Sequence, residues 1–288
     1  MPKCALCGKE DELKENSHII PKFVFEKIKK QSATGFMRNI ENPDRRVQDG
    51  DKQPLLCEEC EDLFSKYERI FARDLFHKFL DDGTTSFKYD NWLHYFITSV
   101  NWRTLYLDLV DFVRITELSI DEIESLINAE RIMKDYLLSN RDDIREIENH
   151  IYFFDEINVA DEEIANEGPH RFFRGSAFGY TFLNHDTKAC YVYSNLAGII
   201  ICTIIKKHPD DEWQNTLVKK GNGEVVMPQY IRSIIIDEMF NYMFDCKKNE
   251  MSEKQQLKLV EQLKKNTERL LNSKTFEFYL MDKNIKKK

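Results

Sequence analysis

The stretch LLCEEC (residues 55–60) decides the fold of the first part of this chain, because it pairs with CALC at residues 4–7. Two thiolates separated by two residues can turn toward one tetrahedral ion, at roughly 2.3 Å from zinc. We therefore expect one Zn²⁺ to be held by Cys4, Cys7, Cys57 and Cys60. Four protein ligands saturate zinc, so this ion is expected to be structural rather than catalytic.

The other cysteines indicate where the protein works. Cys190, Cys202 and Cys246 lie scattered in apolar surroundings, and seven is an odd number. This usage is typical of a reducing compartment with one metal site, so we expect a cytoplasmic protein. No secretory signal precedes the first cysteine pair. The longest apolar run covers residues 196–205. A membrane helix needs roughly 20 residues, so the run predicts a buried strand and no membrane partner.

Composition sets broad limits on function. The chain has 288 residues, of which 42% are hydrophobic and 32% charged, as in globular proteins. Its net charge of −8 argues against a surface that binds nucleic acid throughout. A local basic site, or a protein partner that supplies contacts, remains compatible with this charge.

Periodicity predicts helices in the middle of the chain. Apolar residues recur at helical spacing over residues 61–80 and 89–115. A third helix is expected after Ser119, which forms a capping-box pattern with Glu122. We also expect a strand that ends near residue 20 and a short helix that Pro21 opens.

From residue 150 the period changes toward two, which favours strands. Strands are expected over residues 150–160 and 176–205, with a turn at 184–188, and a hairpin over 215–229. Helices are expected over 229–246 and 252–272, and a last strand with a basic end over 274–288. The fold class is therefore α+β. We expect a zinc-bound module at residues 1–80, followed by residues 81–288, helical over about 81–149 and mixed over about 150–288.

The order of motifs in the first 70 residues resembles the HNH endonuclease family. A first CxxC pair is followed by SHIIP (residues 17–21), a loop, and LLCEEC opening a helix. The resemblance implies a treble-clef or ββα-metal module. It also implies that His18 is a general base that takes a proton from water, a role that suits an imidazole near neutral pH. Beside it, the family holds one divalent ion against the scissile phosphate.

Two of the three signature positions differ from the family. Residues 51–53 contain no asparagine, and Glu61 stands where a histidine is usual. Ser17 also replaces the carboxylate that commonly precedes the first histidine. Carboxylates suit Mg²⁺ or Mn²⁺, so Glu61, Asp51 and Glu68 are the candidate ligands of a catalytic ion. Asp49 is a further loop acid within reach.

Each candidate also has a plain structural reading. His18 could bond to backbone beside the cysteines, and Glu61 could stabilise a helix N-terminus. Phosphate contacts are expected from three basic residues that could equally be solvated surface charges: Arg45, Arg46 and Lys22. The mixed stretch at residues 169–180 is either a nucleic-acid surface or a strand edge with a loop.

Two functions follow from these observations. The first is a metal-dependent endonuclease that hydrolyses phosphodiester bonds in DNA, with RNA as a second substrate class; the resemblance implies a setting in bacterial restriction or phage defence. The second is a catalytically inactive, zinc-scaffolded module that binds nucleic acid or a protein partner. Long amphipathic helices also allow a homo-oligomer. The enzyme needs a second divalent ion near His18 besides the zinc, and the binding module does not. A His18 that faces the core, with no carboxylate near its ring, would contradict the enzyme.

Overall fold

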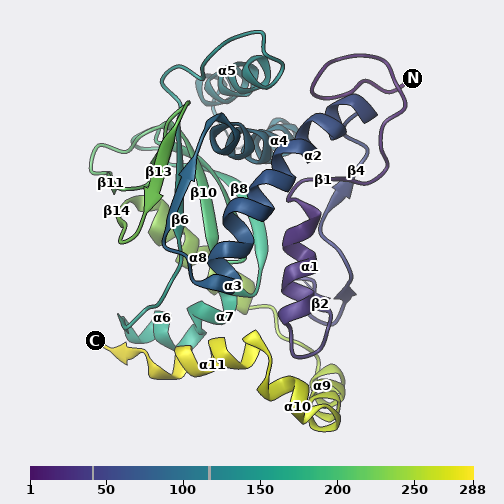
Figure 1. Ribbon diagram of the computed structural model, residues 1–288, viewed down its shortest axis with the longest axis vertical. Coiled ribbons are helices and arrows are strands. Elements are labelled where there is room, and N and C mark those ends of the chain that lie inside the picture. The colour runs from purple at the N-terminus through teal and green to yellow at the C-terminus, as the bar shows by residue number, and fades with distance from the viewer. Residues whose placement is uncertain (41, 116–117) are drawn as a thin grey trace.

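The computed structural model describes residues 1–40, 42–115 and 118–288. Helices and strands are mixed along the chain, which confirms the α+β class (Figure 1). Within the described residues, no helix combines the length and the apolar character that a membrane crossing requires.

A five-stranded antiparallel sheet forms the centre of the molecule. Its strand order is β12-β6-β10-β9-β8, with bounds Leu217–Val218, Glu148–Phe153, Ile199–Lys206, Cys190–Leu196 and Ala177–Leu183. The predicted apolar run forms β10, and β8 joins β9 through the predicted turn. All residues of β9 are buried, because helices cover both faces of the sheet.

Side chains alternate between these two faces along each strand. Ile151 and Ile201 point toward helix α4 (Asn91–Ile115), where they join Phe96 in one apolar cluster. Ile200 and Cys202 point the other way, toward α8 (Ile234–Lys247). The sheet is therefore the middle layer of three.

Helices in the middle of the chain follow the predicted pattern. Helix α2 (Glu58–Phe71) runs through a π-helical turn (Ala72–Phe76) into α3 (His77–Asp82). Helix α5 (Ile120–Leu137) begins at the predicted capping box: Glu122 N donates to the Ser119 hydroxyl, and the Glu122 carboxylate accepts from Ser119 N.

The N-terminal residues form short strands around one helix. Helix α1 spans Lys22–Gln31. Strand β1 (Ser17–His18) pairs with β4 (Lys52–Gln53), and β2 (Met37–Arg38) pairs with β3 (Arg46–Val47).

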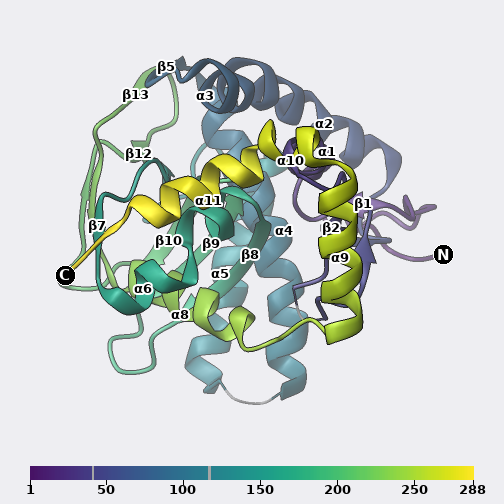
Figure 2. The same cartoon turned by 90° about the horizontal axis from the view of Figure 1, so that it is seen from below.

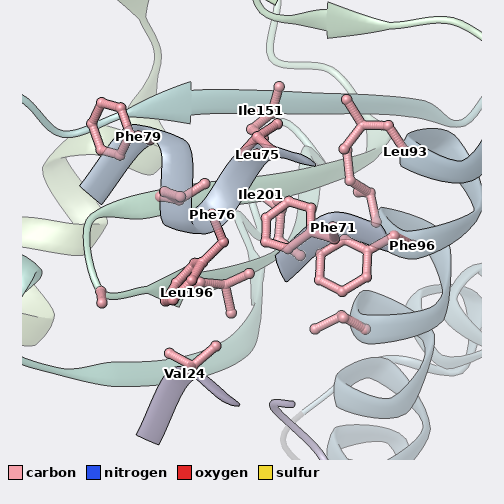
Figure 3. Packing of buried hydrophobic residues seen from close by; sticks show 14 of the residues in the cluster. Val24, Phe71, Leu75, Phe76, Phe79, Leu93, Phe96, Ile151, Leu196 and Ile201 are labelled. Carbon is pink, nitrogen blue, oxygen red and sulfur yellow. The ribbon is translucent and has the colours of Figure 1, made fainter. Parts of the chain in front are cut away.

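These N-terminal elements share their core with the sheet. Val24 of α1 and Phe71 of α2 belong to the same cluster as Phe96 and Ile201 (Figure 3). The predicted boundary at residue 80 thus lies within one continuous core.

The C-terminal elements frame the sheet and reach back to the N-terminal part. Small strands are β5 (Ser86–Tyr89), β7 (Val159–Ala160), β11 (Glu212–Gln214), β13 (Gly223–Val226), β14 (Tyr230–Arg232) and β15 (Lys286–Lys287). The remaining helices are α6 (Glu162–Glu167), α7 (Pro169–Arg174), α9 (Glu253–Lys265), α10 (Thr267–Leu271) and α11 (Lys274–Asn284). Figure 2 shows α9 beside β2 and α11 crossing below the sheet.

Several sequence predictions are wrong. Residues 230–232 form strand β14 instead of the start of a helix, and residues 169–174 form helix α7 instead of a strand edge or loop. Residues 215–229 do not form a hairpin: β12 extends the main sheet beside β6, and β13 pairs with β5. Burial of Val218 and Val225 in the core outweighs local pairing across the glycines.

Residues 274–284 form a helix instead of the expected strand. The Ser273 hydroxyl accepts from Phe276 N at its start, and Phe278 and Asp282 are buried against neighbouring elements. Long-range packing outweighs the local pattern here.

Candidate functional site

The four cysteines of the two CxxC pairs come together, as predicted. Their Sγ atoms all lie within 4.8 Å of one another, so they can hold a metal ion. Gly8 takes a positive φ of 73° and donates its N–H to the carbonyl of Cys4, which closes the first turn. Cys57 is the N-cap of α2, so the second pair sits at the start of a helix. Among the residues described, no other cluster of three or more metal-binding side chains occurs.

Without an ion, the thiols of this cluster differ in acidity. Burial opposes charge on Cys4, but hydrogen bonds from the backbone of Cys7 and Cys57 lower its pKa to about 7. Burial raises the pKa values of Cys57 and Cys60. A bound cation would favour the ionised form of these thiols.

His18 lies on β1, directly beside an acidic loop. Its Nε2 is 3.1 Å from Oδ2 of Asp49, and Lys52 Nζ is 2.8 Å from the same oxygen. The alignment of His18 and Asp49 is not that of a regular hydrogen bond, so we treat the contact as electrostatic. Burial opposes charge on Asp49, but contacts with Lys52 and His18 lower its pKa to about 2. Asp49 is thus a carboxylate that can stabilise a protonated imidazole.

Arg103 of α4 positions the strand that carries His18. Its Nη1 donates to the carbonyl of His18 at 2.7 Å, and its Nη2 donates to Oε1 of Glu68 at 2.8 Å. The side chain is only 2% exposed, and Nε donates to the carbonyl of Ser99. Sequence reasoning missed Arg103; an arginine in the middle of the apolar stretch of residues 89–115 was the available signal.

Glu61 lies behind β1, close to Ser17. Burial raises its pKa, which a hydrogen bond with Ser17 counteracts, and its Oε1 is buried without a partner. The Ser17 hydroxyl also accepts from Leu56 N at 3.2 Å, so this side chain helps to hold the segment before the second cysteine pair.

The predicted ligands of a catalytic ion are not gathered at one point. Glu68 is engaged by Arg103, and Asp51 lies exposed on the loop before β4. Glu61, Asp51 and Glu68 do not form a compact cluster in the part of the chain that the structure describes. Arg103 takes one oxygen of Glu68, whereas the carboxylate of Asp51 is exposed.

The three predicted phosphate contacts differ in their surroundings. Arg45 is exposed, and Lys22 forms a surface ion pair with Glu26 at 3.3 Å. Arg46 stacks over the ring of Phe36, with 4.0 Å between its guanidinium carbon and the ring centroid. Arg46 also donates to Gln262 of α9 at 3.3 Å, so it links the N-terminal loop to the C-terminal helices.

Comparison with known proteins identifies no relative of this chain. No protein-family model matches it, and neither the curated proteins nor the solved structures contain a match. The site is therefore interpreted from its own residues.

Proposed function

We propose that the protein is a metal-dependent, HNH-like endonuclease that hydrolyses phosphodiester bonds in DNA, with a zinc-held treble clef at its N-terminus. The observation that carries this proposal is the contact of 3.1 Å between His18 and the carboxylate of Asp49. The contact lies on the antiparallel pair β1–β4, which leads directly into the helix that Cys57 caps. Two short strands followed by a helix agree with a ββα-metal arrangement.

Zinc fits the geometry of the four cysteines. A tetrahedral ion with bonds of roughly 2.3 Å places its sulfur ligands roughly 3.8 Å apart. Sγ of Cys7 and Sγ of Cys57 are separated by 3.8 Å. Four thiolates also suit zinc better than a hard cation.

In the proposed reaction, His18 takes the proton of the attacking water. Asp49 stabilises the imidazolium that forms, because its lowered pKa keeps it ionised. Arg103 holds the β1 backbone, so the imidazole keeps its place on the loop side. Glu61 and Asp51 would hold Mg²⁺ or Mn²⁺, which would stabilise charge on the phosphate. Exposed Arg45 and Lys22 are available for phosphate contacts.

One observation favours the alternative, an inactive module that binds nucleic acid or a protein partner. Ser17, at the position of the usual carboxylate, is used within the fold by Leu56 N. The described carboxylates also form no second metal cluster. The contact with Asp49 favours the enzyme, because a carboxylate beside the ring would stabilise the imidazolium that a general base becomes.

The test is cleavage of a supercoiled plasmid in Mg²⁺ and in Mn²⁺. Wild type, His18→Ala and the control His77→Ala are compared at equal zinc content, because loss of the fold would imitate loss of catalysis. His77 is a half-exposed histidine whose contact is Asp81. We expect cleavage by wild type and His77→Ala and none by His18→Ala. Equal cleavage by all three would exclude His18 as the general base, whereas binding of the plasmid without cleavage in either metal would support the inactive module.

A further inference from the structure

A cleft of about 900 Å³ separates the N-terminal part of the chain from the C-terminal helices. One wall is the loop around β2 and β4, and another is formed by α7, β8 and α8. Helices α9, α10 and α11 border the cleft beside β2 (Figure 2). Ligand sites commonly measure roughly 300–1,000 Å³, so the cleft has the size of a small-molecule site.

Arg38 brings unused hydrogen-bond donors to this cleft. Its Nη1 donates to the carbonyl of Pro43 at 2.6 Å, but Nε and Nη2 are buried and have no partner. Burial and the neighbouring Arg46 both lower the pKa of Arg38, and Asp44 offsets them only in part. A guanidinium has hydrogen-bond donors only, and a buried donor without an acceptor costs free energy. Because Arg38 lines the cleft, an anion bound there would satisfy both atoms once the guanidinium turned toward it.

Arg174 repeats this feature on the opposite wall. Its Nε is buried without a partner, burial lowers its pKa, and its guanidinium lies 4.9 Å from the ring centroid of Phe278. Lys247 of α8 lines the same cleft, and burial together with the nearby Arg171 lowers its pKa. Neither Arg38 nor Arg174 forms an ion pair with any carboxylate that the structure describes. The cleft therefore offers two separate places for negative charge.

Aromatic rings line the same cleft as these charges. Phe36 lies under Arg46 and Arg38, while the rings of Phe178 and Tyr242 pack in a tilted arrangement with centroids 4.8 Å apart. All three rings line the cleft. Aromatic rings beside arginines without a bound anion are a combination that suits nucleotides. Bases stack on aromatic rings, and phosphates accept paired hydrogen bonds from guanidinium groups.

We propose that this cleft binds a nucleotide that carries two or more phosphate groups, with Arg38 and Arg174 as its anion contacts. The two guanidinium groups belong to different walls of the cleft, so a ligand that contacts both needs more than one phosphate group. The same chemistry is offered by a free nucleoside polyphosphate and by the end of a single strand. Asp49 and Asp51 also line it, so a strand end bound here would pass beside His18. Binding itself requires no catalysis by His18.

The test is calorimetric titration of the full chain in EDTA-free, divalent-free buffer of low salt. The probes are adenosine triphosphate, a 5′-phosphorylated deoxyadenosine tetranucleotide and inorganic triphosphate. Each is titrated into wild type, His18→Ala, Arg38→Gln, Arg174→Gln and the control Arg131→Gln. Arg131 is exposed on α5, away from the cleft. Arg38→Lys is added, because it keeps the charge and loses the fork.

We expect the adenosine triphosphate or the tetranucleotide to bind, and the tighter of the two to identify the source. Arg38→Gln and Arg174→Gln should each weaken binding about tenfold or more, whereas His18→Ala and Arg131→Gln should leave it unchanged. Arg38→Lys should bind at an intermediate strength. Binding of neither nucleotide probe, equal binding of inorganic triphosphate, or an equal loss in Arg131→Gln would overturn the proposal. Binding that persists in a wild type without nuclease activity would separate it from the proposed function.

Discussion

Replacing Arg103 by methionine tests how the candidate site is held in place. Methionine fills much of the same volume but cannot donate to the carbonyl of His18 or to Glu68. The Glu68 side chain is 18% exposed, so its carboxylate would lose its cation in a largely water-poor position. His18 would keep its place on β1 only through pairing with β4.

The expected loss of stability follows from this burial. Removing one partner of a buried ion pair costs about 3–5 kcal/mol, and the partial exposure of Glu68 places Arg103→Met near the lower end, at about 3 kcal/mol. The double variant Arg103→Met, Glu68→Met leaves no unpaired charge. It still loses the bond to the carbonyl of His18, worth about 1 kcal/mol. The double variant should therefore be more stable than Arg103→Met alone.

Urea unfolding of the metal-loaded protein measures these differences. Free energies of unfolding for wild type, both single variants and the double variant form a thermodynamic cycle. A coupling of about 2 kcal/mol or more is expected between Arg103 and Glu68. A loss below about 1 kcal/mol in Arg103→Met, or additive effects in the double variant, would refute the reasoning. In that case the contact between α4 and β1 would be incidental.

Three further outcomes are expected. Cys60→Ser should lower bound zinc, measured by elemental analysis, from about one per chain to near zero, since tetrahedral binding needs all four thiolates. Asp49 has a folded pKa lowered to about 2, so its contribution is present above its unfolded pKa near 4 and is lost as pH falls through 2. The Asp49→Asn variant should therefore lose less stability than wild type as the pH falls through that range, as measured by thermal unfolding. An identical dependence of stability on pH in the two proteins would contradict this account. The dependence of stability on pH has the opposite sign for Asp108. Burial raises its pKa to about 6, so its contribution makes stability fall as pH rises from about 4 to 6. In Asp108→Asn this decline should disappear; an unchanged decline would mean that another group titrates.

Local signals explain the predictions that were confirmed. The two CxxC pairs, the capping box at Ser119 and the turn at residues 184–188 each rest on a few neighbouring residues. Their geometry needs no knowledge of the rest of the chain, and sequence reasoning therefore places them well.

Distant packing explains what the sequence did not reveal. Arg103 and His18 are 85 positions apart in the sequence, and no local sequence pattern predicts their contact. The cleft combines Arg38, Arg174 and Phe278, which lie far apart in the sequence. Residues 274–284 become helical because Phe278 and Asp282 find partners on other elements. In each case the deciding contact is long-range.

The shared core has a consequence for how the candidate site works. Strand β1 has only two residues, and a pair of such short strands is too small to be stable alone. Its position depends on the cysteine cluster at one end and on Arg103 at the other, while Val24 and Phe71 bury α1 and α2 against the sheet. The imidazole of His18 is thus positioned by helix α4, which also contacts β8, β9 and β10 of the central sheet. A ligand that moves α7 or β8 at the cleft would act on the same helix. Helix α4 therefore contacts both a strand that lines the cleft and the strand that carries His18.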